Sequence, residues 1–150
     1  MIRAYADLDP RVRPLAMVLK KWSKRVKVYN PSSGFSSYCI YLLLIFFLQT
    51  RPDPILPNLQ SKSGEIVYLV DGHNCHFETV TDWKTSNVES LGQLLAKFFL
   101  YFWQFDYKHY AVSVRLGKLV NKSSCNFVSS PIAVEDPFET SKMRIYNNYL

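Results

Sequence analysis

The spacing of apolar residues predicts an amphipathic helix near the start of the chain. Asp9 and Pro10 are typical of a helix start, because aspartate can cap the first turn and proline fits within it. Lys20 and Lys24 lie four residues apart, so they project from the same side of such a helix. The residues that would form its apolar face follow the three- and four-residue spacing of a helix: Leu15, Val18, Leu19 and Trp22.

A second helix is predicted over residues 38–48, where almost every side chain is apolar. As a helix this run spans roughly 16 Å, which is too short to cross a hydrocarbon core of about 30 Å. A core helix that is buried on nearly all sides is therefore the better interpretation. Ser36 or Ser37, after a cluster of turn-forming residues, can cap its first turn.

A third and longer helix is predicted over residues 90–105. Ser86 and Glu89 have the spacing of a capping box just ahead of it. We expect this helix to be the largest element of the core. Its buried stripe would consist of Leu91, Leu94, Leu95, Phe98, Phe102 and Phe105.

Shorter segments have the composition of strands and loops. Residues 65–70 are compatible with a strand, followed by a turn at Asp71–Gly72. Residues 111–116 alternate as in a half-buried strand, 117–130 read as a polar loop, and 132–134 as a short strand. The predicted fold class is α+β, predominantly α-helical, with a few short strands and one domain over residues 1–150.

The balance of charge favours acidic partners. The chain of 150 residues has 18 Lys and Arg against 12 Asp and Glu, a formal net charge of +6. RNA, nucleotides and an anionic membrane surface are all compatible with this charge, and charge alone does not choose among them. The first residues contain no apolar stretch of the kind found in secretory signals.

The three cysteines suggest a reducing compartment. They are odd in number and far apart in the sequence, so free thiols are the simplest interpretation, and we expect a location in the cytoplasm or the nucleus. His73 and His76 flank Cys75, but a zinc site would need a fourth ligand, so we interpret these residues as part of a loop.

Two short motifs together point to nucleotide recognition. Asp136 and Glu139 flank a Pro-Phe turn and can accept hydrogen bonds from a base edge. Ser37 at a helix start can meet phosphate, and Tyr38 can stack on a ring. Structural interpretations stay open for both motifs: the serine as a helix cap, the tyrosine as a core residue, and the acids as turn or cap residues. Lys20 and Lys24, likewise, could form a solvated basic face.

Taken in order, these and other motifs resemble the helical domain associated with poly(A) polymerases in the noncanonical RNA nucleotidyltransferases, the family of terminal uridylyltransferases and cytoplasmic poly(A) polymerases. The resemblance runs almost from end to end. The motifs that carry it are AYADLDPRVRPL at 4–15, KKWSK at 20–24, PSSGFSSY at 31–38, LPNLQ at 56–60, SLG at 90–92, FF at 98–99, FDY at 105–107 and EDPFE at 135–139.

The resemblance implies an enzyme that transfers nucleotides from an NTP to an RNA 3′ end. The catalytic carboxylates, with Mg²⁺ or Mn²⁺, would lie in an upstream polymerase-β-like domain of the same protein, so this chain alone is predicted to be inactive and to contain no catalytic or metal-binding residues of its own. Its partners would be the RNA 3′ end, UTP or ATP, and that upstream domain, and we expect no membrane partner.

The resemblance also assigns roles to residues. Lys20 and Lys24 match the lysines that contact the triphosphate, Ser37 the phosphate-contacting serine, and Tyr38 the base-stacking tyrosine. Asp136 and Glu139 match the acids that read the base. Lys142 stands where uridylyl-transferring members often have histidine; its donor-only ammonium group suits the O4 atom of uracil and favours UTP over ATP.

Three alternatives stay open at this point. The parent protein could be a poly(A) polymerase that uses ATP, or a silent RNA- or protein-binding module that has kept the fold and lost the chemistry. A relative of the 2′-5′ oligoadenylate synthetases is a third interpretation. The sequence that precedes this domain would distinguish the silent module, because two-metal phosphoryl transfer requires paired aspartates.

Overall fold

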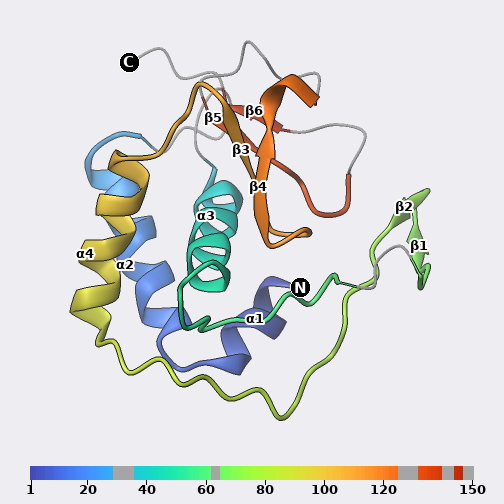
Figure 1. Cartoon of the computed structure of the whole chain (residues 1–150), viewed down its shortest axis with the longest axis horizontal. Helices are drawn as coiled ribbons and strands as arrows, with labels where there is room; N and C mark the ends of the chain where they lie inside the picture. The colour runs from blue at the N-terminus through green and yellow to red at the C-terminus, as the bar shows by residue number, and fades with distance from the viewer. Residues whose placement is uncertain (29–35, 62–64, 125–131, 140–143, 147–150) are drawn as a thin grey trace.

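The structure is a computed structural model that describes residues 1–28, 36–61, 65–124, 132–139 and 144–146. Four α-helices and six short strands occur in these ranges, which agrees with the predicted α+β class (Figure 1). The helices are α1 (Ile2–Leu8), α2 (Val12–Arg25), α3 (Ser37–Gln49) and α4 (Leu91–Trp103). The strands are β1 (Leu69–Val70), β2 (His73–Asn74), β3 (Tyr110–Ser113), β4 (Lys118–Asn121), β5 (Ile132–Val134) and β6 (Arg144–Tyr146), with a short 3-10 turn at Lys122–Ser124.

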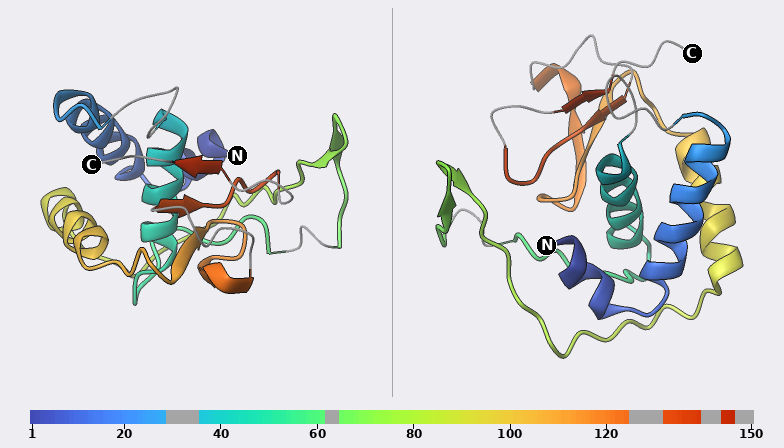
Figure 2. Two further views of the ribbon diagram at one scale, coloured as in Figure 1. Left: turned by 90° about the horizontal axis from the view of Figure 1, so that it is seen from above. Right: turned by 180° about the vertical axis from the view of Figure 1, so that it is seen from behind.

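Helix α3 forms the centre of the molecule, as its uniformly apolar sequence predicts. Ten of its 13 residues are buried, and it lies between the pair α2 and α4 and the sheet that contains β3 and β5 (Figures 1 and 2). Ser36 is its N-cap and accepts a hydrogen bond from the backbone N–H of Cys39 at 3.2 Å. Within the described ranges, no helix has the length and apolar composition needed to cross a bilayer.

Helix α2 begins later than predicted. Arg11 is its N-cap, while the Asp9 carboxylate accepts hydrogen bonds from the backbone N–H and the guanidinium of Arg11 at 2.9 Å each. Two of the four predicted core residues are buried, Leu15 and Leu19. Val18 and Trp22 are 46% and 39% exposed instead, so the apolar face of α2 is wider than the part of it that is buried in the core.

Helix α4 has a different cap from the predicted one, and the Glu89 carboxylate of the predicted box pairs with Arg51 and Lys97 instead. Ser90 caps the helix, and Gln93 completes the box by accepting from the Ser90 N–H at 2.8 Å. Leu94 and Phe98 are buried, whereas Leu91 is 42% exposed. Leu95, Phe102 and Phe105 pack against the core from its edge. The prediction that this helix is the largest core element is therefore wrong, since α3 has that role.

Glu89, from the predicted capping box, is the centre of a charged network. It accepts hydrogen bonds from Asn87, Lys97 and Arg51, and Arg11 donates to the backbone oxygens of Asn87 and Glu89. Burial alone would raise the pKa of Glu89, but these donors outweigh burial and hold the pKa at about 2. The network ties the start of α4 to the start of α2 and to the end of α3.

The main sheet has the strand order β4-β3-β5-β6, with β3 and β5 parallel and the other neighbours antiparallel. The strand predicted over 111–116 is observed as β3, and it is more than half-buried: Ser113 is fully buried like its apolar neighbours, and its hydroxyl donates to the buried carboxylate of Glu135. The predicted loop over 117–130 is wrong at its start, where β4 forms an edge strand. Residues 125–131 lie outside the described ranges, and the strand predicted at 132–134 is confirmed as β5.

Tyr5 of α1 holds the chain that follows α3. Its buried hydroxyl accepts hydrogen bonds from the side chain of Gln49 at 2.9 Å and from the backbone N–H of Leu59 at 3.1 Å. Burial raises the pKa of Tyr5 to about 12. The segment 56–60 is thereby fixed beside the core, and it carries the residues that support the site described below.

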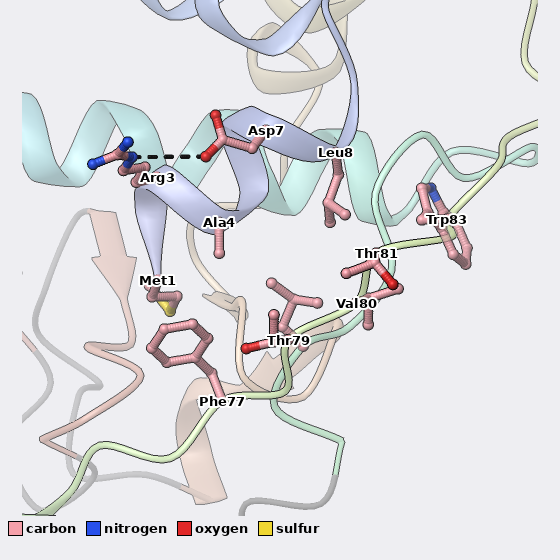
Figure 3. Close-up of a pocket in the computed structure, with 11 residues that line it drawn as sticks. Met1, Arg3, Ala4, Asp7, Leu8, Phe77, Thr79, Val80, Thr81 and Trp83 are labelled. Atoms are coloured by element: carbon pink, nitrogen blue, oxygen red, sulfur yellow. Dashed lines mark ion pairs between the residues drawn. The ribbon is translucent and has the colours of Figure 1, made fainter.

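A cavity of about 610 Å³ lies between α1 and the extended segment 77–83. Figure 3 shows the apolar side chains of Met1, Ala4 and Leu8 on one side and those of Phe77, Val80 and Trp83 on the other. Of the residues predicted to bind nucleotide, those within the described ranges are not among the side chains that line it.

Strands β1 and β2 form a small hairpin away from the main sheet (Figure 1). The turn predicted at Asp71–Gly72 is confirmed, with φ values of 50° and 82°. Positive φ at both central residues is the signature of a type I′ hairpin turn. The strand predicted over 65–70 is reduced to Leu69 and Val70.

Candidate functional site

Tyr38, Asp136 and Glu139 line one open pocket of about 410 Å³. Tyr38 lies in the first turn of α3, and the two acids follow β5, almost a hundred residues later in the sequence. Phe138 completes this side of the pocket, and four residues of the β1–β2 hairpin form the other: Val70, Asp71, His73 and Cys75.

The acids reach the pocket because β5 pairs with the central strand. The backbone N–H of Glu135 continues that pairing by donating to the carbonyl oxygen of Val112 at 2.8 Å. The buried Glu135 carboxylate accepts from the Ser113 hydroxyl and from two nitrogens of the Arg115 guanidinium at 3.1 and 2.6 Å. Glu135 is therefore a structural residue that fixes where Asp136 begins.

Asp136 is also held by its own turn. Its Oδ1 atom accepts from the Phe138 backbone N–H at 3.1 Å, and the Tyr38 hydroxyl lies 3.4 Å from the same oxygen, a long contact for a hydrogen bond. The buried side chain of Gln60 donates to the Pro137 carbonyl oxygen at 3.1 Å. The structural role considered for Asp136 is thus present. The two oxygens of a carboxylate offer several acceptor positions, so a structural role and a role in recognition are compatible.

The residues predicted to meet phosphate lie at the same end of the molecule. Lys20 and Lys24 lie in the second half of α2, with Lys24 in the last turn, and Ser37 is the first residue of α3. Figures 1 and 2 show that the end of α2 and the start of α3 both face the end where β5 and β6 lie. Backbone N–H groups at the start of a helix attract anions. Binding of one triphosphate by these three residues stays a prediction.

Lys142, predicted to lie near the base, falls outside the described residues. His73 and Cys75 were predicted to lie in a loop without a functional role, but they line the same pocket as Tyr38 and Asp136. The Asp71–Gly72 turn was a signal for the hairpin, but the sequence contains no signal for where the hairpin lies. Among the described residues, no group of three His, Cys, Asp or Glu side chains could hold a metal ion.

The chemistry of the pocket suits recognition of a flat ring with donors on its edge. The aromatic side chains of Tyr38 and Phe138 line the pocket together with three carboxylates, which are hydrogen-bond acceptors when ionised: Asp71, Asp136 and Glu139. Stacking on a tyrosine tolerates any base, whereas acceptors on the rim favour a base that presents N–H groups.

Comparison with known proteins is consistent with this geometry. Residues 90–142 match the family model described as Cid1 family poly A polymerase. The poly(A) RNA polymerase cid13 of Schizosaccharomyces pombe is 36% identical to this chain. The match covers 95% of this chain and 27% of cid13. Human terminal uridylyltransferase 4 is also 36% identical, over 93% of this chain and 9% of its own length.

The solved structure of Cid1 in complex with the UTP analogue UMPNPP has the same fold. It superimposes with a TM-score of 0.85 and 29% identity, over 93% of this chain and 48% of that structure. This chain thus spans less than half of each of these relatives. In sequence and in fold, the chain belongs to the family of noncanonical RNA nucleotidyltransferases, which includes poly(A) RNA polymerases and terminal uridylyltransferases.

Proposed function

We propose that this chain is the nucleotide-recognition domain of a template-independent RNA 3′-terminal nucleotidyltransferase, and that the enzyme adds uridylates from UTP. The observation that carries the proposal is the single pocket that contains Tyr38, Asp136 and Glu139. The relatives, which include a terminal uridylyltransferase and a protein solved with a UTP analogue, support the same activity.

In the proposed complex, the base stacks on Tyr38 and presents its edge to the acids. The N3–H of uracil is a donor, so an ionised carboxylate can accept from it. Lys142 would supply a donor to uracil O4. Facing adenine, the same ammonium would meet the N6 amino group, donor against donor.

The triphosphate would lie between the start of α3 and the end of α2. Ser37 and the helix N-terminus would contact one phosphate, and Lys20 and Lys24 would neutralise the others. We place the bond-making chemistry in an upstream domain of the same protein, whose aspartates would hold Mg²⁺ or Mn²⁺ and activate the RNA 3′ hydroxyl. The isolated chain would therefore bind nucleotide weakly and transfer none.

Competition among the four NTPs in the enzyme that contains this domain tests the proposal. With Mg²⁺ and a short RNA, we expect mainly uridine incorporation. Asp136→Asn should reduce incorporation of uridine by roughly ten- to a hundredfold, because a hydrogen bond to a charged group is lost. Asp82→Asn makes the same chemical change at an exposed position outside the pocket and should have no effect.

ATP is the alternative substrate, favoured by the poly(A) RNA polymerases among the relatives. The two acids can accept from the adenine N6 amino group as well as from uracil. Preferential incorporation of adenosine would replace the uridylyl assignment by this alternative. Absence of transfer with every NTP would leave a binding module without catalysis.

A further inference from the structure

The β1–β2 hairpin forms the second wall of the base pocket. Val70, Asp71, His73 and Cys75 line the same 410 Å³ space as Tyr38 and the acids. Nothing in the roles discussed above uses these four residues. A wall that faces the reading edge of a base can take part in choosing the base.

The hairpin has a defined internal structure that fixes its side chains. The Asp71–Gly72 turn sets the register, with Val70 opposite His73 and Leu69 opposite Asn74. The Asn74 side chain accepts from the backbone N–H groups of Tyr68 and His76, at 3.0 and 3.1 Å, and donates to the Ile66 carbonyl oxygen at 3.1 Å. The Asn74 side chain thus holds both strands of the hairpin together.

The hairpin and the acid turn are anchored to the same segment. Beyond β2, the backbone N–H of Glu78 donates to the carbonyl oxygen of Leu59 at 2.7 Å, and the Ser61 hydroxyl donates to the Glu78 carboxylate at 3.0 Å. The next residue after Leu59 is Gln60, which donates to the carbonyl oxygen of Pro137. The separation between the hairpin and the acids is therefore set by a few neighbouring hydrogen bonds.

Alternation along the hairpin directs His73 into the pocket. Side chains two residues apart on a strand share a face, and directly paired residues also share a face. His73 and Cys75 meet the first condition, and Val70 and His73 meet the second. All three line the pocket, as this rule requires.

We infer that His73 is a specificity-determining residue, whose imidazole N–H donates to a carbonyl oxygen of uracil while Asp136 and Glu139 accept from N3–H. This inference rests on the proposed function. Carboxylates cannot satisfy an acceptor such as O4, and this oxygen has two lone pairs, so it can accept from a donor on the hairpin side as well as from the proposed Lys142 ammonium. The Tyr38 hydroxyl already points to Asp136, whereas the imidazole of His73 supplies an N–H on the facing wall.

The same donor disfavours adenine. The N6 amino group of adenine takes the place of O4 and would face the imidazole N–H, donor against donor. A neutral imidazole can turn its acceptor nitrogen instead, so the preference is reduced rather than absolute. Loss of one such hydrogen bond corresponds to about a three- to tenfold change.

The first test measures the UTP:ATP incorporation ratio in the enzyme that contains this domain. His73→Ala should lower the ratio about three- to tenfold, and His73→Asn, whose amide keeps a donor, should keep it within about twofold of the wild type. His109→Ala removes an exposed histidine outside the pocket and should leave the ratio unchanged. An unchanged ratio in His73→Ala, in an enzyme whose wild type extends RNA, overturns the inference.

A second readout needs no turnover, so it separates failure of this inference from failure of the proposed function. Cys75 lies on the His73 face of the hairpin and lines the pocket. Saturating UTP should therefore slow alkylation of Cys75, followed by mass spectrometry, at least about threefold, as expected from exclusion of a small reagent from a filled site. Inorganic tripolyphosphate carries the charge without the base and should not protect. In an enzyme that incorporates UTP, equal rates of alkylation with and without UTP would show that the hairpin does not face the base.

Discussion

Removing the guanidinium of Arg115 should destabilise the protein by leaving a buried charge without its partner. The Glu135 side chain is 6% exposed and that of Arg115 is 25% exposed. Removing one partner of a buried ion pair costs about 3–5 kcal/mol. Because a quarter of Arg115 is in contact with water and the Ser113 hydroxyl still donates to Glu135, we expect Arg115→Ala to lower the free energy of unfolding by about 2–3 kcal/mol.

Urea unfolding followed by tryptophan fluorescence measures this loss. Arg13→Ala is the matched control, since Arg13 pairs with Asp7 where both side chains are more than half exposed, and such pairs contribute at most about 1 kcal/mol. Adding Glu135→Gln to Arg115→Ala removes the unpaired charge and should recover part of the loss. A free energy of unfolding for Arg115→Ala within about 0.5 kcal/mol of wild type would refute the structural role given to this pair.

Three further predictions follow from the contacts described above. Tyr5→Phe removes the acceptor of a buried backbone N–H and should lower the free energy of unfolding by about 1–3 kcal/mol in the same assay; an unchanged value would contradict the role of that hydroxyl. The folded pKa of Glu89, about 2, lies below its ordinary value of 4.5. The stability that Glu89 contributes is therefore present above pH 4.5 and is lost as the pH falls from about 5 to about 2, a slope that should be weaker in Glu89→Gln. In the enzyme that contains this domain, Lys24→Ala should lower kcat/KM for the NTP by about ten- to a hundredfold, and unchanged kinetics would return Lys24 to a solvated face.

The elements that the sequence predicted correctly are those whose residue pattern is compatible with only one kind of secondary structure. Residues 38–48 are apolar on all sides, so only a buried helix accommodates them, and α3 is that helix. The short strand at 132–134 and the Asp71–Gly72 turn were also predicted, because their local chemistry is specific. The edge strand β4 was missed, since its polar, largely exposed residues look like a loop until a partner strand is present.

The errors at the helix starts have a common physical cause. Asp9 and Glu89 are residue types that often cap helices, but the carboxylate of each forms an ion pair with an arginine. Asp9 pairs with Arg11, and Glu89 pairs with Arg51. A charge-assisted hydrogen bond to a guanidinium is worth more than a cap, so tertiary pairing decides where α2 and α4 begin. Sequence spacing contains no information on such partners.

Some residues of the candidate site could be predicted from the sequence, and others could not. Tyr38, Asp136 and Glu139 could be named from the resemblance, and the structure places them around one pocket, but their contacts with a nucleotide stay a prediction. His73 and Cys75 could not be named. Their place beside Asp136 depends on the bonds that Leu59 and Gln60 make to residues far away in the sequence.

A crystal structure of the enzyme that contains this domain, with a non-hydrolysable UTP analogue, would show whether the base binds in the pocket between α3 and the hairpin. We expect the uracil ring to stack on Tyr38, with its edge within hydrogen-bond distance of Asp136 or Glu139, directly or through one water. A base bound elsewhere, with the pocket between α3 and the hairpin filled only by solvent, would contradict this expectation.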